Sequence, residues 1–159
     1  MRNHLIIVAA LFGAVFVATA VSRAAEMESF KVLKTRGDVM VMAPDADDFS
    51  KAENGQSYDF GTVIRTERNS WATMELSEGN TFKLLARTDL KVLPKVKHRK
   101  LVALKLNDGE VEVKLDDFPK DMNFEVQTPV GVCAAVGTSF NLSYDAAQSK
   151  MVLDMIEGD

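Results

Sequence analysis

The sequence predicts an all-β protein of about ten short strands, arranged as a sandwich or a short β-solenoid-like domain. Apolar residues alternate with polar ones along much of the chain, as in strands with one buried face. Glycine, aspartate and asparagine separate these segments at short intervals, which is typical of turns. After residue 25, no stretch keeps a helical apolar period for the ten or so positions that a helix needs.

The first 24 residues have the pattern of a secretory signal peptide. Arg2 and His4 precede an apolar run from Leu5 to about Ala20, and small residues follow it. The alternative is an uncleaved anchor, because the run is only slightly shorter than the roughly 17–25 residues that span a membrane. We expect residues 25–159 to form one domain outside the cytoplasm. It would be periplasmic or secreted after cleavage, or anchored in the inner membrane and facing the periplasm.

The charge balance argues against a nucleic-acid partner. The chain has 19 basic and 23 acidic side chains, and residues 1–24 contain Arg2 and Arg23 but no acid. Their removal changes the formal net charge from −4 to about −6, which favours solubility and repels phosphate backbones. Cys133 is the only cysteine and lies among apolar residues, so we interpret it as a small buried side chain.

Six strands are expected before residue 95. They lie at residues 30–34, 39–42, 63–66, 71–76, 82–84 and 90–94. A polar loop is expected from Pro44 to Tyr58, and Glu78-Gly79-Asn80 predicts a tight reversal. The alternation is plainest from residue 71, where Ala72, Met74 and Leu76 should face the core.

A basic connector follows from Lys95 to Lys100 and leads to a strand expected at residues 101–106. Asn107-Asp108-Gly109 is the strongest hairpin signal in the sequence and predicts a return strand at 111–115. Further strands are expected at residues 124–127, 132–144 and 152–156. Because every residue from Val132 to Val136 is apolar or small, we expect both faces of that segment to be covered.

Gly137 interrupts the strand expected at residues 132–144. A glycine inside a strand marks a bulge or a close approach of a neighbouring backbone. Thr138 shares a face with Phe140 and Leu142, so its hydroxyl should be buried and bonded to a carbonyl of a neighbouring strand. We therefore expect structural roles for Gly137 and Thr138.

Short motifs occur in a fixed order from about Lys31 to Asp159. They include Gly37-Asp38-Val39, Gly61 to Thr66, Glu78-Gly79-Asn80, Leu104 to Val111 around Gly109, Phe124 to Pro129, Val136 to Phe140, and Ile156-Glu157-Gly158. Their order and spacing resemble the FecR-type domain, named for the iron-dicitrate transport regulator of Gram-negative bacteria. The resemblance implies structural roles for Gly37, Gly61, Thr66, Gly79, Gly109, Pro129, Gly137, Thr138, Phe140 and Gly158.

The resemblance also implies an extracytoplasmic domain that acts through protein contacts. In the best-known members, one chain holds a cytoplasmic anti-sigma region, a membrane helix and this domain, which relays the state of an outer-membrane transporter to a sigma factor. Only Met1 to His4 precede the apolar run, so we expect no cytoplasmic sigma-binding region in this sequence. The expected function is that of a protein-binding sensor or adaptor in the bacterial cell envelope. The partner and the oligomeric state stay open.

The residues do not assemble into a catalytic or metal-binding set, so we expect neither enzymatic activity nor a cofactor. His98 lies among basic residues without an acid beside it, which favours a solvated loop. One histidine and one cysteine after residue 24 are too few for an ordinary zinc site. Asp45, Asp47 and Asp48 are similar to a calcium loop but lack its glycine and its distal glutamate.

Two features are candidates for contacts. Trp71 alternates with polar residues, so it could stand on the outer face and anchor a partner or stack on a sugar; alternatively, it caps the core edge beside Arg65. Lys95, Lys97 and Arg99 of the connector could bind an anionic polysaccharide, a phospholipid or an acidic protein surface, or could simply be solvated. Together they support a second hypothesis, a carbohydrate or cell-wall binding module.

Overall fold

The computed structural model describes residues 27–157. The expected signal peptide or anchor and the motif residue Gly158 lie outside this range. The described chain consists of strands and connecting loops, which confirms the all-β prediction. Within residues 27–157 there is no helix of the length and apolarity that crossing a membrane requires.

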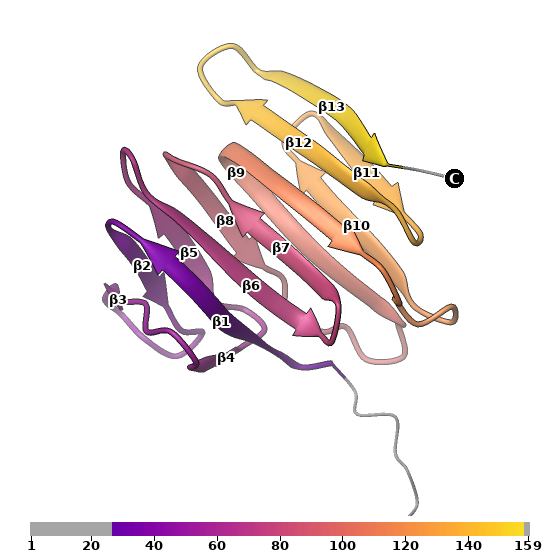
Figure 1. Cartoon of the computed structure of the whole chain (residues 1–159), viewed down its shortest axis with the longest axis horizontal. Coiled ribbons are helices and arrows are strands. Elements are labelled where there is room, and N and C mark those ends of the chain that lie inside the picture. The colour runs from indigo at the N-terminus through magenta and orange to yellow at the C-terminus, as the bar shows by residue number, and fades with distance from the viewer. Residues whose placement is uncertain (1–26, 158–159) are drawn as a thin grey trace, which may run out of the picture.

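Thirteen strands follow one another along the chain (Figure 1). They are β1 (Ser29–Arg36), β2 (Val39–Met42), β3 (Ser50–Lys51), β4 (Ser57–Asp59), β5 (Val63–Thr66), β6 (Trp71–Ser77), β7 (Asn80–Leu84), β8 (Thr88–Val92), β9 (Leu101–Leu115), β10 (Asn123–Thr128), β11 (Gly131–Ala135), β12 (Ser139–Asp145) and β13 (Lys150–Glu157). β3 and β4 lie in the segment predicted as a polar loop. They contain only two and three residues, too few to show an alternating pattern.

The strands form two stacked layers that share β9 (Figure 1). The first half of β9 pairs with β8 and, in parallel, with β10, whereas its second half pairs with β7 and β12. The first layer therefore has the order β3-β2-β5-β8-β9-β10-β11, and the second has the order β4-β1-β6-β7-β9-β12-β13. The arrangement is a sandwich in which one strand belongs to both sheets.

The prediction of a hairpin at Asn107-Asp108-Gly109 is wrong. β9 runs without interruption from Leu101 to Leu115 and passes from one layer to the other at this point. Gly109 has a φ of 99°, which L side chains rarely adopt, and the register between β8 and β9 shifts beside it. The chain bends instead of reversing because each half of β9 pairs with strands that are distant in the sequence.

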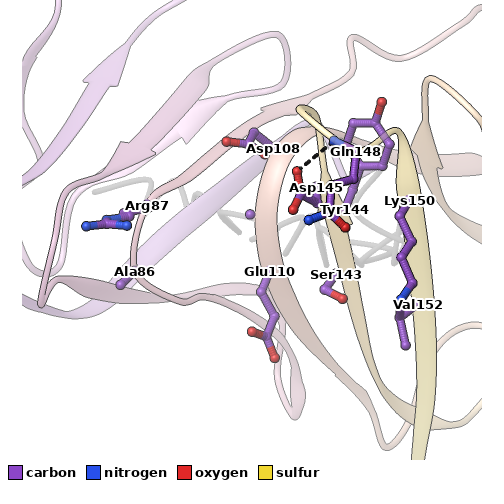
Figure 2. A pocket seen from close by; sticks show the side chains of 11 residues that line it. Ala86, Arg87, Asp108, Glu110, Ser143, Tyr144, Asp145, Gln148, Lys150 and Val152 are labelled. Carbon is purple, nitrogen blue, oxygen red and sulfur yellow. Dashed lines mark hydrogen bonds between the residues drawn. The ribbon is translucent and has the colours of Figure 1, made fainter.

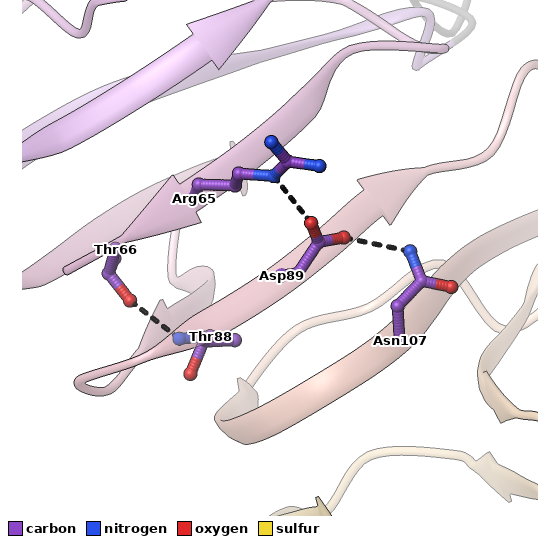
Figure 3. Close-up of polar contacts among 5 residues, drawn as sticks. All are labelled: Arg65, Thr66, Thr88, Asp89 and Asn107. Carbon is purple, nitrogen blue, oxygen red and sulfur yellow. Dashed lines mark hydrogen bonds and ion pairs between the residues drawn. The ribbon is translucent and has the colours of Figure 1, made fainter. Parts of the chain in front are cut away.

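Buried threonines tie the bend to the first layer. The Thr88 hydroxyl accepts a hydrogen bond from the Glu110 amide (3.0 Å) and donates one to the Glu110 carbonyl (3.2 Å). The Thr66 hydroxyl donates to the Leu85 carbonyl and accepts from the Thr88 amide (3.0 Å; Figure 3). Since both threonines are buried, these bonds offset the cost of removing their hydroxyls from water.

A row of polar side chains lies outside the same strands. The Arg65 Nε donates to Asp89 Oδ2 (2.6 Å), and the Asn107 amide donates to Asp89 Oδ1 (2.8 Å; Figure 3). Asp89 thus joins β5 to the start of the bend in β9. Arg65 also lies over the Phe49 ring, with its guanidinium carbon 4.4 Å from the ring centroid.

Apolar side chains from both layers fill the space between them. Ala72, Met74 and Leu76 are buried, as the alternation in this strand predicts. The largest fully buried side chains include Phe30 and Phe82 from the second layer and Phe124 from the first. The core therefore draws on residues from the beginning, the middle and the last third of the chain.

Residues 132–144 do not form one strand. β11 ends at Ala135 in the first layer, β12 begins at Ser139 in the second, and Gly137 lies in the link. A Cβ at Gly137 would have no neighbour within 4 Å, so the predicted close approach is wrong; its φ of 59° is what requires glycine. Thr138 is half-buried rather than buried, and its carbonyl accepts a hydrogen bond from the Leu115 amide (3.3 Å).

We expect Gly109→Ala to lower the free energy of unfolding by about 3 kcal/mol or more. The added Cβ would lie 2.4 Å from the Thr88 Oγ1 and 2.6 Å from the Thr88 Cα, in a φ region that already disfavours alanine. Gly55→Ala is the matched control, because Gly55 has a φ of 84° but open space around its Cα. Its expected cost is about 1–2 kcal/mol.

Urea unfolding followed by circular dichroism measures both variants. An equal loss of stability in the two would contradict the importance of close packing between Gly109 and Thr88.

Candidate functional site

Large apolar side chains are exposed mainly on the end strands of the two layers. Within residues 27–157, β11 pairs with β10 alone, and β13 pairs with β12 alone. Apart from Leu33 and Val96, every large hydrophobic residue that is exposed in the described part of the chain lies on or next to one of these strands. Adjacent exposed apolar residues are typical of protein interaction sites.

The first group, which we call the β11 patch, consists of Val130, Val132, Ala134 and Val136. The exposed fractions of Val132 and Val136 are 58% and 68%, although both were expected to be covered. That prediction is wrong because only one face of β11 packs against the other layer. Its side chains at 133 and 135 face the core, while those at 132, 134 and 136 face outward.

A shallow groove of about 300 Å³ adjoins the β11 patch. Its lining residues are Leu93, Pro94, Val96, Arg99, Leu101, Ala103 and Gln127. Gln127 on β10 pairs directly with Val132, so the groove and the patch form one continuous surface. The basic connector lies over this outer face of the first layer, where it covers Ala103 and leaves 55% of Val96 exposed.

Basic side chains lie at the groove or near it. Arg99 is exposed and lines the groove, Lys105 is exposed beside the lining residue Gln127, and Lys97 is exposed in the connector. Lys100 forms an ion pair with Asp121, and its hydrogen bond and positive charge lower the pKa of that carboxyl group. Lys95, which was also predicted as a contact residue, is half-buried. His98, which was expected in a solvated loop, is exposed and has a φ of 66°.

Trp71 lies in the other layer, on the outer face of β6. It is half-buried, and the Nζ atoms of Lys34 and Lys83 lie 5.9 Å and 5.4 Å from the centroid of its ring. The alternative position beside Arg65 is wrong, because Arg65 pairs with Asp89 in the first layer. The structure therefore does not bring Trp71 and the basic connector into one site.

A polar hollow of about 480 Å³ lies where the β9 bend meets the β12–β13 turn (Figure 2). Asp108 accepts a hydrogen bond from the Ala146 amide (3.0 Å), and Asp145 accepts one from the Gln148 amide (3.0 Å). These carboxylates hold the turn in place. Residues 27–157 contain no group of three or more histidine, cysteine, aspartate or glutamate side chains arranged to hold a metal ion.

Cys133 is buried and faces the core side of β11. Burial raises the pKa of its thiol, because the thiolate would lose solvation. A thiol that stays protonated is a poor nucleophile. This environment agrees with the expected role of Cys133 as a small packing residue.

We expect dithionitrobenzoate to modify Cys133 at least about tenfold more slowly in the folded chain than in the urea-unfolded chain. Both the burial and the raised pKa reduce the amount of reactive thiolate at slightly alkaline pH, so the folded rate should increase as the pH rises further. Absorbance of the released nitrothiobenzoate measures the two rates. Equal rates would show that the thiol is accessible and reactive.

A protein-family model described as "FecR protein" matches residues 62–159. Comparisons with curated proteins and with solved structures give no significant match. The matched residues include strands β5 to β13, and thus the bend in β9, the basic connector and both exposed end strands.

Proposed function

The chain belongs to the FecR protein family, a family of regulators and sensors, and from this premise we propose that it is an exported, non-enzymatic domain that binds a protein in the bacterial cell envelope. The observation that carries the proposal is the continuous surface formed by the β11 patch and the adjoining groove. The signal-peptide pattern of residues 1–24 supports export to the periplasm or beyond. If that segment is retained, it would instead anchor the domain in the inner membrane.

The shape of this surface suits a protein partner better than a small ligand. Val132 projects from β11 and Val136 from the link that follows it, and β-branched side chains have few rotamers to lose on binding. The groove beside them is shallow and offers room for an apolar side chain of the partner. Burial of these valines would supply the main favourable free energy, at about 25 cal/mol per Å² of apolar area.

The charges around the groove indicate which charge the rim of the partner's surface should carry. Arg99 lines the groove, Lys105 pairs with the lining residue Gln127, and Lys97 is exposed in the same connector, although the formal net charge of the whole chain is negative. A partner with an apolar centre and an acidic rim would complement this surface. Such complementary charges mainly increase the association rate and select among partners.

The carbohydrate-binding alternative has weaker support. Its two expected elements, Trp71 and the basic connector, lie on the outer faces of different layers. In addition, Lys34 and Lys83 lie over the Trp71 ring, where a sugar would have to stack.

Site-specific crosslinking tests the proposed surface. A photo-crosslinking amino acid in place of Val132 should give one discrete adduct with an envelope protein, and the same amino acid in place of Leu33 should not. Leu33 is the matched control because it is also apolar and 40% exposed, but lies in the second layer. Mass spectrometry identifies the adduct.

Binding of the identified protein is then measured by calorimetry. We expect Val132→Lys to weaken binding at least about tenfold, since it places a charge in the apolar centre, and Leu33→Lys to leave binding unchanged. Unchanged binding by Val132→Lys would rule out this surface. Retention of the protein on insoluble glycans that is lost only in Trp71→Ala would support the carbohydrate-binding alternative.

A further inference from the structure

The β13 strand is a sheet edge with several exposed apolar residues. Its pairing with β12 leaves the opposite backbone edge free of a neighbouring strand in the described part of the chain. Val152, Leu153, Met155 and Ile156 have exposed fractions of 38%, 43%, 57% and 55%. Such an edge is a template for pairing with another strand, unless charges, proline or a bulge in the middle protect it.

The first half of β13 has none of these protections between its two charged residues. The residues between Lys150 and Asp154 are Met151, Val152 and Leu153, without a charge or a proline. The register shift between β12 and β13 lies between the partners of Ser139 and Phe140, in the second half of β13.

The apolar core also ends at this strand. Phe140 and Leu142 on β12 are fully buried, but their partners on β13, Met155 and Leu153, are exposed. These two side chains lie on the core-facing side of the second layer, beyond the reach of the first layer. An additional strand beside β13 would cover them and continue the sheet.

We propose that β13 pairs with β13 of a second copy of the chain, antiparallel and with the two-fold axis at Val152. In this register Lys150 lies opposite Asp154 of the second copy, and Met151 lies opposite its Leu153. The two-fold symmetry forms each pair twice, so two Lys–Asp pairs flank an apolar centre. The second layers of the two copies then form one continuous sheet. This interface does not use the β11 patch and is independent of the proposed partner.

The charges of β13 select this register over its neighbours. If the axis passed through Leu153, Asp154 would lie opposite Val152 and Lys150 opposite Ile156. If it passed through Asp154, two carboxylates would face each other, which is unfavourable. If the axis passed between two residues, the core-facing side chains of one copy would lie on the same face of the joined sheet as the outward-facing side chains of the other. The axis at Val152 brings opposite charges together while keeping the core-facing residues on one side.

Charge-exchange variants of the full chain, purified after export, test this register. Sedimentation analysis should show a monomer–dimer equilibrium for the unaltered protein. Lys150→Asp places two aspartates opposite each other twice, and Asp154→Lys does the same with lysines. Each should raise the dimer dissociation constant at least about tenfold. The double variant Lys150→Asp/Asp154→Lys restores both opposite-charge pairs and should dimerise like the unaltered protein.

Mixing the two single variants shows whether a monomeric variant has lost the correct charge pairing or has misfolded. A Lys150→Asp chain carries two aspartates and an Asp154→Lys chain carries two lysines, so an equimolar mixture should form a heterodimer although each variant alone is monomeric. Circular dichroism checks that both variants keep their strands. A monomeric unaltered protein, undiminished dimers of the single variants, or failure of both the mixture and the double variant to dimerise would overturn the proposal. Loss of partner binding in Val132→Lys, without a change in dimerisation, would confirm that the two surfaces are separate.

Discussion

The passage of β9 between the layers is the constraint on which the rest of the structure depends. Gly109 permits the bend because it adopts a φ of 99° and has no Cβ to meet Thr88. Thr88 then binds both polar backbone groups of Glu110, which fixes the direction in which β9 leaves the first layer. The strands that pair with each half of β9 lie in the same layer as that half. β7 and β12 therefore lie in the second layer, and β8 and β10 in the first.

Much of the fold can be predicted from the sequence, because strands with one buried face leave an alternating pattern. Ala72 to Leu76 is such a case: its apolar positions are buried and its polar positions face outward. The pattern fails where pairing between distant strands decides the outcome. Asn107-Asp108-Gly109 has the composition of a hairpin, yet β7 and β12 hold the following residues in the other layer. Local turn chemistry carries no information about those partners.

The candidate site was predictable only in part, for a related reason. The basic connector is visible as a run of charges, and one of its exposed members, Arg99, lines the groove. The valines of the β11 patch were interpreted as core, because an apolar run does not show whether another layer covers its outer face. The presence of such a cover depends on contacts across the whole chain. For Trp71, the outer face was one of two expected alternatives, but its two lysine neighbours were not predicted.

The shared strand also has a consequence for how the protein gains and loses its structure. Two layers with separate strands could in principle unfold one after the other, but here neither layer is complete without its half of β9. Opening one layer removes the support of the other, so a single cooperative transition is the natural outcome. Since β9 joins strands that precede and follow it by tens of residues, few of its pairings are local. Folding of such a topology is slow and is completed only after the late strands β12 and β13 are in place.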